Sequence, residues 1–426
     1  MVDNWEVDTV VVGAGLAGLT AANKLTAAGR SVAVLEAGDD VGGRTRTLDL
    51  DGHIAELGGE WVGPDHRQMF ALLRRYGLHT CPARQLGRAG LWRDHAGASV
   101  RRLPPASPAQ RLVLLRACRR LDRAAAAVHP VQPWLSVDAE RLDAIRFGAW
   151  LRDQGLTSAL VTYLGAAIGS LTSSDIEDIS LLHVLWWVAR GNGVLRMLRT
   201  TFARVIVEGA HMVSARLAAD LGDQPVLDAP VRRIGHGDGV QVEYGHGRWV
   251  RARHAVITAP VGSLAAIRFD PGLPAPLAAL DELRAKPGTK VVAVLPADHR
   301  MRHRFALGGG PLAAAWRVDR RVTGFASPTT AERPTAELVD DLAALSGVRV
   351  AELGSPTVYR WSTHTHIPGC DIGFEPGQLT RHGPNLSRSH GPLHFAGAER
   401  SSWPNNMEGA VESGVRAAGE ILTSAA

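Results

Sequence analysis

The sequence contains few cysteines and no long apolar run. Its three cysteines, Cys81, Cys118 and Cys370, are far apart and odd in number, so they provide neither a disulfide framework nor the ligand spacing of a zinc site. No stretch approaches the roughly 20 apolar residues that a membrane-spanning helix needs. The N-terminus is acidic and leads directly into an apolar strand, which is unlike a secretory signal. We therefore expect a cytoplasmic protein that has no membrane partner and no metal site.

Lysine is also scarce, because the chain has 44 arginines but only three lysines. Two of the three, Lys286 and Lys290, fall in the short segment AKPGTK. Lysine is a compact cation that can lose its proton when it is buried, whereas arginine keeps its charge. Because arginine supplies the ordinary positive charges of this chain, the two neighbouring lysines are candidates for a specific chemical role.

The arginines give a formal net charge of +5, but they are spread along the chain. The densest group recurs at helical spacing beside leucines and comprises Arg116, Arg119, Arg120 and Arg123. This pattern is typical of the solvated face of an amphipathic helix, and no nucleic-acid-binding motif accompanies it. We therefore expect no nucleic-acid partner.

Length and composition indicate two globular domains. The chain has 426 residues, of which 45% are hydrophobic and 21% charged, and it exceeds what one ordinary core accommodates. Helices are expected over much of 107–200 and at about 210–221. Short strands are expected at 226–227, 231–234, 240–244, 249–251, 255–258 and 288–296. The segment 354–392 shows little periodicity, and the chain closes with an expected strand at 393–396 and an expected helix at 407–422.

The first 36 residues contain a strand–helix–strand unit with a glycine-rich turn. Apolar runs at 9–12 and 31–35 predict strands, and 16–28, which begins with Leu16 and Ala17, predicts a helix. The turn between them has the GxGxxG spacing, with Gly13, Gly15 and Gly18. The first glycine permits the tight turn, the second lets a pyrophosphate approach the backbone, and the third lets the helix lie close to the strand. The helix N-terminus favours the negative charge of a phosphate.

Glu36 ends the second strand and follows Gly15 by 21 residues. A carboxylate at this place can accept hydrogen bonds from a ribose diol, and it disfavours a ribose that carries a phosphate. The unit therefore predicts a dinucleotide site, but NAD and FAD both fit it.

The next residues distinguish these two cofactors. Gly42-Gly43-Arg44 follows Glu36-Ala37 with the spacing E-A-x-x-x-x-G-G-R. This segment resembles an element of the FAD-dependent amine oxidase family, which includes monoamine and polyamine oxidases. Two glycines and an arginine can surround a diphosphate with backbone donors and a forked side chain. The resemblance implies FAD as the cofactor, with contacts from Ala37, Gly43 and Arg44.

Further motifs match the family in the same order along nearly the whole chain. The segment 56–63 (ELGGEWVG) is similar to the loop that lies along the flavin in that family. The segment 209–234 resembles its second FAD segment, and 254–260 resembles the strand that returns to the nucleotide domain. FAGAE at 395–399 and WPNNMEGAVESG at 403–414 resemble its closing motif. The resemblance implies further cofactor contacts from Gly58, Gly59, Glu60, Trp61, Val231, Trp361, Gly397, Ala398, Glu399 and Met407.

The resemblance also implies the fold, which is α/β with a Rossmann-like FAD-binding domain interleaved with an α+β substrate domain. We expect the FAD-binding domain to comprise 1–80, 206–265 and 390–426. We expect the substrate-binding domain to comprise 81–205 and 266–389. The resemblance is weakest in the helical part of the latter.

Two residues match positions that act on the flavin in the family. Lys290 stands where the family has a lysine bridged by water to flavin N5, with Lys286 as the alternative, because the alignment needs a one-residue gap. Cys370 follows Trp361 by nine residues, as does the cysteine that forms a thioether to the flavin in mammalian-type monoamine oxidases. Many bacterial relatives bind FAD without a covalent bond. A link through Cys370 and a small buried thiol therefore both remain open.

The chain departs from the family where the substrate is expected. Typical monoamine oxidases place two tyrosines before the flavin, and these positions hold Asp371 and Asn406 here. A carboxylate and an amide favour a polar or cationic substrate, through charge-assisted hydrogen bonds. Alternatively, Asp371 points into solvent. Together with Lys290, these two residues are the candidate catalytic residues.

We therefore expect a soluble, bacterial-type FAD-dependent oxidoreductase that oxidises a C–N bond of an amine or amino-acid-like substrate. In the family, a hydride passes from the carbon beside nitrogen to flavin N5, an imine forms, and oxygen reoxidises the flavin. The alternative is an FAD-dependent C–C desaturase or tailoring oxidoreductase that acts on a carotenoid-like or natural-product substrate. The expected partners are a small-molecule amine and molecular oxygen, with a homodimer as one option.

Overall fold

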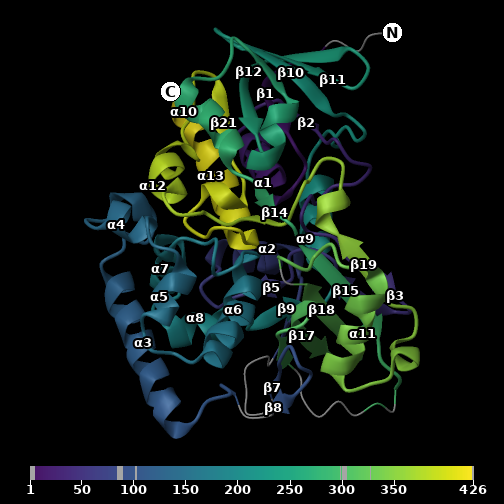
Figure 1. The fold of residues 1–426 in the computed structure, drawn as a ribbon. Helices are drawn as coiled ribbons and strands as arrows, with labels where there is room; N and C mark the ends of the chain where they lie inside the picture. Colours follow the sequence, from purple (N-terminus) through teal and green to yellow (C-terminus); the bar gives the residue numbers. More distant parts are fainter. Residues whose placement is uncertain are drawn as a thin grey trace.

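The computed structural model of the protein describes residues 5–83, 90–100, 103–297, 299, 305–326 and 328–424. Two large sheets organise the fold. One lies in the upper half of Figure 1, and the other lies in the lower half beside a group of helices. Both halves are built from separated stretches of the chain. The residue boundaries of the two domains remain a prediction.

The upper sheet is built on the N-terminal strand–helix–strand unit. Its order is β13-β10-β11-β12-β1-β2, and β21 also pairs with β12. β1 is parallel to β2 and β12, and β12 is parallel to β21, as in a nucleotide-binding sheet. The strands are β1 (Trp5–Val12), β2 (Val32–Leu35), β10 (Val231–His236), β11 (Val240–Tyr244), β12 (Arg248–Ile257), β13 (Arg268–Asp270) and β21 (Leu393–Phe395). The predicted glycine turn therefore lies between β1 and the first helix.

β12 is one continuous strand, whereas the sequence predicted two strands at 249–251 and 255–258. Arg251 and Arg253 interrupt the apolar pattern, but they are exposed and alternate with buried neighbours. They therefore lie on the solvent side of a single strand. The predicted strand at 226–227 was also wrong, because it is only an isolated bridge to β2.

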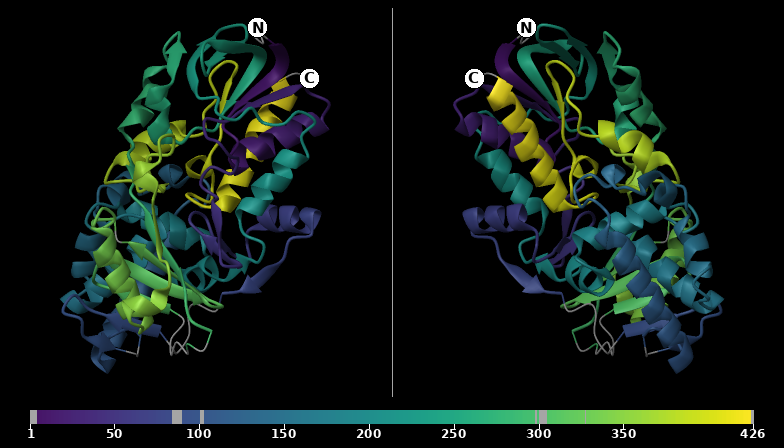
Figure 2. Two further views of the ribbon diagram at one scale, coloured as in Figure 1. Left: turned by 90° about the vertical axis from the view of Figure 1, so that its right-hand side faces the viewer. Right: turned by 90° about the vertical axis from the view of Figure 1, so that its left-hand side faces the viewer.

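Three helices pack beside the upper sheet, and all three were predicted. They are α1 (Leu16–Ala27), α9 (His211–Ala219) and α13 (Met407–Ser424). Figure 2 shows α13 in yellow running beside the purple α1. A Cβ atom on Gly414 would lie 2.3 Å from the carbonyl oxygen of Ala17, so the two helix backbones approach closely.

The lower sheet has the order β19-β15-β18-β17-β16-β7-β8. Its strands are β7 (Gly90–Arg93), β8 (Ser99–Val100), β15 (Thr289–Val294), β16 (Phe305–Gly308), β17 (Leu312–Val318), β18 (Arg321–Ala326) and β19 (Thr357–Arg360). Apolar side chains of α11 (Thr335–Ser346) join those of this sheet in one buried cluster. β15 lies within the strand predicted at 288–296. β19 was missed, because its residues lie in the stretch without periodicity.

Smaller sheets connect the two halves. They are β3 (Thr47–Leu50) with β4 (His53–Glu56), β5 (Trp61–Val62) with β9 (Arg204–Ile206) and β6 (Thr80–Pro82), and β14 (Ala285–Lys286) with β20 (Asp371–Ile372). Two of the predicted site residues lie on these strands, Trp61 on β5 and Asp371 on β20.

The remaining helices are α2 (Arg67–Tyr76), α3 (Pro108–Ala126), α4 (Ala139–Asp143), α5 (Phe147–Arg152), α6 (Ser158–Thr172), α7 (Leu181–Arg190), α8 (Val194–Thr201), α10 (Ala275–Ala278) and α12 (Gln378–His382). Of these, α3 to α8 confirm the helical prediction for 107–200, and α2, α10 and α12 lie outside that range. The four clustered arginines of α3 are exposed, whereas Leu121 packs in the core. Among the described residues, no helix combines the length and the apolar character that crossing a bilayer requires.

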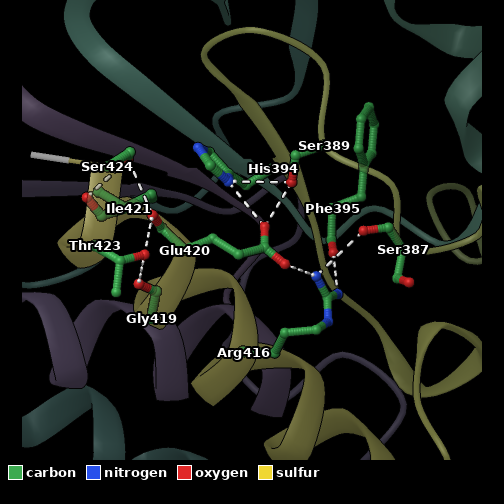
Figure 3. A network of polar contacts seen from close by, with 10 residues as sticks. All are labelled: Ser387, Ser389, His394, Phe395, Arg416, Gly419, Glu420, Ile421, Thr423 and Ser424. Carbon is green, nitrogen blue, oxygen red and sulfur yellow. Dashed lines mark hydrogen bonds and ion pairs between the residues drawn. The ribbon is translucent and has the colours of Figure 1, made fainter. Parts of the chain in front are cut away.

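A polar network fastens α13 to β21 (Figure 3). Glu420 of α13 accepts hydrogen bonds from Ser389 (2.5 Å) and Arg416 (2.5 Å) and lies 3.0 Å from Nδ1 of His394. Arg416 also donates to the carbonyl oxygen of Phe395. Burial acts to raise the pKa of Glu420, but the hydrogen bonds from His394 and Ser389 and the charge of Arg416 bring this pKa down to about 2. The ionised carboxylate therefore stabilises the folded state.

We expect Glu420→Gln to lower the free energy of unfolding by roughly 2 kcal/mol at neutral pH, because charge-assisted hydrogen bonds are lost. The pKa of Glu420 in the folded state lies below its usual value of 4.5. Its contribution is therefore complete above that value and disappears as the pH falls toward 2. Denaturant unfolding at neutral and acidic pH measures this difference. Glu6→Gln, at an exposed position of β1, serves as the control, and an equal loss in the two variants contradicts the account.

Candidate functional site

A cavity of about 470 Å³ lies where the upper sheet meets the lower part of the fold. Its wall includes the β1–α1 turn, the segments that follow β2 and β4, Lys290 of β15, and the loops around 361–371 and 397–407. All the predicted site residues except Gly18 and Glu399 line this cavity. The structure therefore brings together residues from both ends and the middle of the chain.

The glycine-rich turn forms one end of the cavity. Gly13 has a φ of +105°, and a Cβ on it would lie 2.5 Å from Oγ1 of Thr258. A Cβ on Gly18 would lie 2.0 Å from the carbonyl oxygen of Gly13, so this glycine serves helix packing, as predicted. Gly15 differs, because the nearest atom to its Cβ would be 3.9 Å away, on Gly42. The space at Gly15, beside the N-terminus of α1, suits a pyrophosphate.

Glu36 lies at the end of β2, where the sequence placed it. Its Oε2 atom accepts a hydrogen bond from the backbone N–H of Ala14 (2.7 Å), and its Oε1 atom accepts one from Gly38 (2.9 Å). These bonds fix the carboxylate beside the glycine turn. Ala37 and Val231 line the same end of the cavity, which suits a ribose and an adenine ring. Ala229 and Pro230 also line it and were not predicted.

Arg44 connects the predicted diphosphate segment to the closing motif. One of its terminal nitrogens lies 2.6 Å from Oε2 of Glu399, and the other donates to the carbonyl oxygen of Cys370 (3.0 Å). Burial acts to raise the pKa of Glu399, but the charges of Arg44 and Arg400 lower it to about 2. Glu399 itself is buried behind the wall of the cavity and accepts a hydrogen bond from Val261 (3.1 Å). It therefore positions Arg44 rather than lining the site.

Lys290 lies in the cavity wall, whereas Lys286 does not. The Lys286 ammonium instead forms an ion pair with Glu375 at 2.8 Å. The Lys290 ammonium donates to the carbonyl oxygens of Glu56 (3.2 Å) and Gly58 (2.8 Å) and to Oε2 of Glu60 (3.0 Å). An ammonium has three hydrogens, so these bonds occupy all of them. Of the two candidates, Lys290 is the one that lines the cavity.

Glu60 is the centre of a buried charge cluster. Its Oε1 atom accepts hydrogen bonds from Arg321 (3.0 Å) and Trp316 (3.2 Å), and its Oε2 atom faces Lys290. A buried carboxylate needs such partners, because its charge is costly to remove from water. The sequence indicated Glu60 and Lys290 but could not indicate Arg321 and Trp316, which lie on the neighbouring strands β18 and β17.

The loop that contains Gly58 and Gly59 is closely packed against other parts of the protein. A Cβ on Gly58 would lie 2.0 Å from the carbonyl oxygen of Arg44, and one on Gly59 would lie 3.2 Å from Cγ of Met407. Trp361 donates its indole hydrogen to the carbonyl oxygen of Leu57 at 2.9 Å. The loop, the start of α13 and Trp361 therefore form one rigid wall.

Cys370 lies in the cavity wall beside β15. A Cβ on Gly288 would lie 3.0 Å from its sulfur atom, and its backbone N–H donates to Lys286 at 2.9 Å. Burial, together with the charge of Asp371, raises the pKa of the Cys370 thiol to about 12. The sulfur is therefore a neutral thiol in the folded protein at ordinary pH.

Asp371 lies in the cavity wall rather than in solvent, so the solvent alternative was wrong. Its Oδ2 atom accepts a hydrogen bond from the hydroxyl of Ser173, just beyond α6, at 2.7 Å. Asn406 also lines the cavity, but its side-chain oxygen accepts a hydrogen bond from the backbone N–H of Gly409 (3.1 Å) and thereby caps α13. Asn405 exchanges two hydrogen bonds with the backbone of Ile372. The sequence did not indicate Ser173 or Asn405.

The rest of the cavity wall comes mostly from the helical region, where the sequence was least informative. Its unpredicted members include Trp187, Met197, Phe202, Trp316, Trp403 and His66. Burial lowers the pKa of His66 to about 4, so its ring is neutral. The ring accepts a hydrogen bond from Gly63 at Nδ1, which places its hydrogen on Nε2. This part of the cavity therefore combines aromatic side chains with uncharged polar groups such as Ser170, Thr200 and Thr201.

The model of a family described as flavin-containing amine oxidoreductase matches residues 16–422. The chain belongs to this family. It is 31% identical over 443 residues to the Mycobacterium tuberculosis protein AofH, which is described as a flavin-containing monoamine oxidase, and the match covers 98% of this chain and 97% of that protein. The family predicted from the motifs is therefore confirmed, and the protein is a flavin-dependent oxidoreductase whose cofactor is FAD.

Solved structures of amine oxidases have the same fold. An alanine-to-cysteine variant of putrescine oxidase, made to redesign cofactor binding, superposes with a TM-score of 0.91 at 27% identity and covers 99% of this chain and 100% of that one. Cyclohexylamine oxidase from Brevibacterium oxydans has a TM-score of 0.88 at 28% identity and covers 98% of this chain and 99% of its own. The predicted α/β amine-oxidase fold is therefore confirmed.

Proposed function

We propose that this enzyme oxidises the C–N bond of a small amine and passes the electrons to oxygen. The observation that carries the proposal is that one cavity joins the dinucleotide turn, the Lys290 ammonium and the Asp371 carboxylate. FAD, when bound, accepts a hydride from the carbon beside the nitrogen and leaves an imine, which water hydrolyses. The cavity residues supply orientation, exclusion of water and charge.

We assign each cavity residue a proposed role according to its place in the cavity. Gly15, Glu36 and Arg44 would hold the phosphates and the ribose, and Gly58 and Gly59 would let the flavin ring lie against the backbone. Lys290 would supply a fixed positive charge at the flavin. Asp371 would meet the substrate. The side chains of the other two candidate catalytic residues, Lys290 and Asn406, are hydrogen-bonded to the protein backbone, whereas within the described residues that of Asp371 is bonded only to the Ser173 hydroxyl.

The family match and the relatives reported above favour amine oxidation over the alternative of a C–C desaturase. A hydrogen peroxide assay with putrescine, cyclohexylamine, benzylamine and free amino acids tests the proposal. We expect peroxide and carbonyl product in equal amounts from at least one amine, with a rate that rises with pH. If an artificial dye, but not oxygen, supports turnover, then the amine part of the proposal stands and the oxygen part is wrong.

We further propose a thioether between Cys370 and the flavin, in which the thiol S–H bond and one C–H bond of a flavin methyl group break, the C–S bond forms, and the two electrons and the hydrogens would reduce the flavin, which oxygen would reoxidise. Cys370 lies in the cavity wall, and the putrescine oxidase variant shows that a cysteine has been used to redesign cofactor binding in a protein of this fold. We expect the yellow colour to stay with the protein pellet after acid precipitation, and to move to the supernatant in Cys370→Ala. Cys118→Ala serves as the control. A wild-type protein that releases its flavin in acid contradicts the link.

A further inference from the structure

We propose that Asp371 is the proton acceptor that converts the bound substrate from an ammonium ion into the neutral, oxidisable amine. The proposal rests on the proposed amine oxidation and adds a catalytic group to it. Its basis is a carboxylate in the cavity wall that the protein holds firmly but leaves without a cationic partner.

The backbone of Asp371 is fixed from two sides. Strand β20 pairs with β14, with Asp371 opposite Lys286. Asn405 holds the next residue, Ile372, by two hydrogen bonds of 3.3 and 2.8 Å. The side chain is fixed as well, because Oδ2 accepts the hydroxyl hydrogen of Ser173. The second oxygen, Oδ1, has no hydrogen-bond partner within the described part of the chain and is available to a ligand in the cavity.

The charged groups around Asp371 are all engaged elsewhere. Arg44 forms its ion pair with Glu399, Lys286 forms one with Glu375, and Lys290 forms one with Glu60. The neighbouring thiol of Cys370 is neutral. Among the described residues, none forms an ion pair with Asp371. The lack of an ion-pair partner favours a cation from the substrate.

Burial raises the pKa of Asp371 to about 6, while the hydrogen bond from Ser173 and the charge of Arg44 act to lower it and Glu399 acts to raise it. The carboxylate is thus ionised in the free enzyme at neutral pH. An alkylammonium ion has a pKa of about 10.4 in water, roughly four units higher. The value for Asp371 already includes its burial, so the remaining difference has to come from the ammonium, whose pKa falls by about 3–5 units when it is fully buried. Burial of the substrate nitrogen in the cavity therefore brings proton transfer within reach.

The step balances without any further reactant. One N–H bond of the ammonium breaks, one O–H bond forms at Oδ1 of Asp371, and the electron pair stays on nitrogen. The pair begins as two opposite charges and ends as two neutral groups. The lone pair on nitrogen is then free to assist loss of hydride from the neighbouring carbon. The carboxyl group returns its proton to solvent when the product leaves.

The test is the pH dependence of anaerobic flavin reduction by the amine that reacts fastest in the panel above. In wild type we expect the rate to rise near the pKa of Asp371, well below that of the amine. In Asp371→Asn the rise should move to the pKa of the amine itself. The rate near neutral pH should then fall about 10²-fold, within the usual range for general base catalysis, and recover at alkaline pH. Asp178→Asn, an exposed acid five residues after Ser173, should leave the profile unchanged.

A second substrate separates proton transfer from a structural role of Asp371. Fluorination at the β-carbon lowers the pKa of an amine, so a β,β-difluoro analogue has a much larger neutral fraction at neutral pH than the parent amine. The ratio of wild-type to Asp371→Asn rates should therefore be much smaller for this analogue than for the parent amine. Ser173→Ala keeps the carboxylate and removes one hydrogen bond to its ionised form. It should shift the rise to higher pH, and it provides a second test if Asp371→Asn fails to fold.

Binding supplies a readout that does not depend on turnover. The α,α-dimethyl analogue of the fastest amine has no hydrogen on the carbon beside nitrogen and cannot be oxidised. Calorimetry in two buffers should show that wild type binds its ammonium form without releasing a proton to the buffer. When the same analogue binds to Asp371→Asn, close to one proton per molecule should be released to the buffer. Equal proton release, or the same pH profile in both proteins, overturns the role of Asp371. Failure of every amine to reduce the flavin overturns the proposed function instead.

Discussion

Replacing Gly15 by alanine is expected to weaken the non-covalent binding of FAD while leaving the fold intact. Gly15 has an ordinary φ of −76°, and its added Cβ would be no closer than 3.9 Å to another protein atom. The new methyl group would instead occupy space at the N-terminus of α1 that a pyrophosphate needs. Overpacking of this kind costs about 1–3 kcal/mol, so the Kd for FAD should rise roughly ten- to hundredfold. Flavin absorption of the purified protein and fluorescence titration of the apoprotein measure the change.

Two other glycines provide the controls for Gly15. Gly419 lies in α13 with open space around it, so Gly419→Ala should keep the flavin. A Cβ on Gly18 would lie 2.0 Å from the carbonyl oxygen of Gly13, so Gly18→Ala should lose the fold and the flavin together. If Gly15→Ala binds FAD as tightly as wild type, then the pyrophosphate does not lie at this turn.

Lys290→Met is expected to slow the reaction of the reduced enzyme with oxygen by about 10²–10³-fold, which is the usual effect of removing a preorganised electrostatic group. The ammonium is held at the cavity wall by three hydrogen bonds, so its charge is fixed there, and in the proposed role negative charge develops beside it during oxygen reduction. Glu60 keeps Arg321 and Trp316 as partners in the variant, which preserves the wall. Stopped-flow mixing of the reduced enzyme with oxygen measures the rate.

Lys286→Met is the matched control, because Lys286 pairs with Glu375 and does not line the cavity. Its reaction with oxygen should match that of wild type, and both variants should keep anaerobic reduction within a few-fold of the wild-type rate. A Lys290→Met enzyme that reacts normally with oxygen contradicts the assigned role. A variant defective only in anaerobic reduction would place Lys290 at the substrate instead.

The cofactor side of the cavity could be predicted from the sequence because its determinants are local. The spacing of Gly13, Gly15 and Gly18 specifies a turn, a close approach and a helix contact within six residues. Each of these requirements is visible in the structure. Glu36 and Arg44 follow in the same short stretch, so the family resemblance could be read without knowledge of tertiary contacts.

The partners of the charged residues could not be predicted, because they are distant in sequence. Glu60 and Arg321 are 261 residues apart, and Ser173 and Asp371 are 198 residues apart. Any of 44 arginines could have compensated Glu60. Periodicity shows which face of a helix is buried, but it does not show which strand or loop that face meets. For this reason the Ser173 contact and the aromatic wall of the cavity appear only in the structure.

Asn406 shows how a position can match while its chemistry differs. The resemblance placed it at the substrate, and it does line the cavity, but its side-chain oxygen caps α13. An asparagine one residue before a helix is a common cap. The sequence therefore also indicated a helix cap at Asn406, but the prediction was based on the family resemblance, which placed this residue at the substrate.

Anaerobic mixing of the purified holoenzyme with the amine panel, followed at the flavin absorption band, tests the central claim most directly. We expect at least one amine to bleach the band, faster as the pH rises, and added oxygen to restore it. A band that dithionite bleaches but that no amine changes at any pH would contradict amine oxidation at this site.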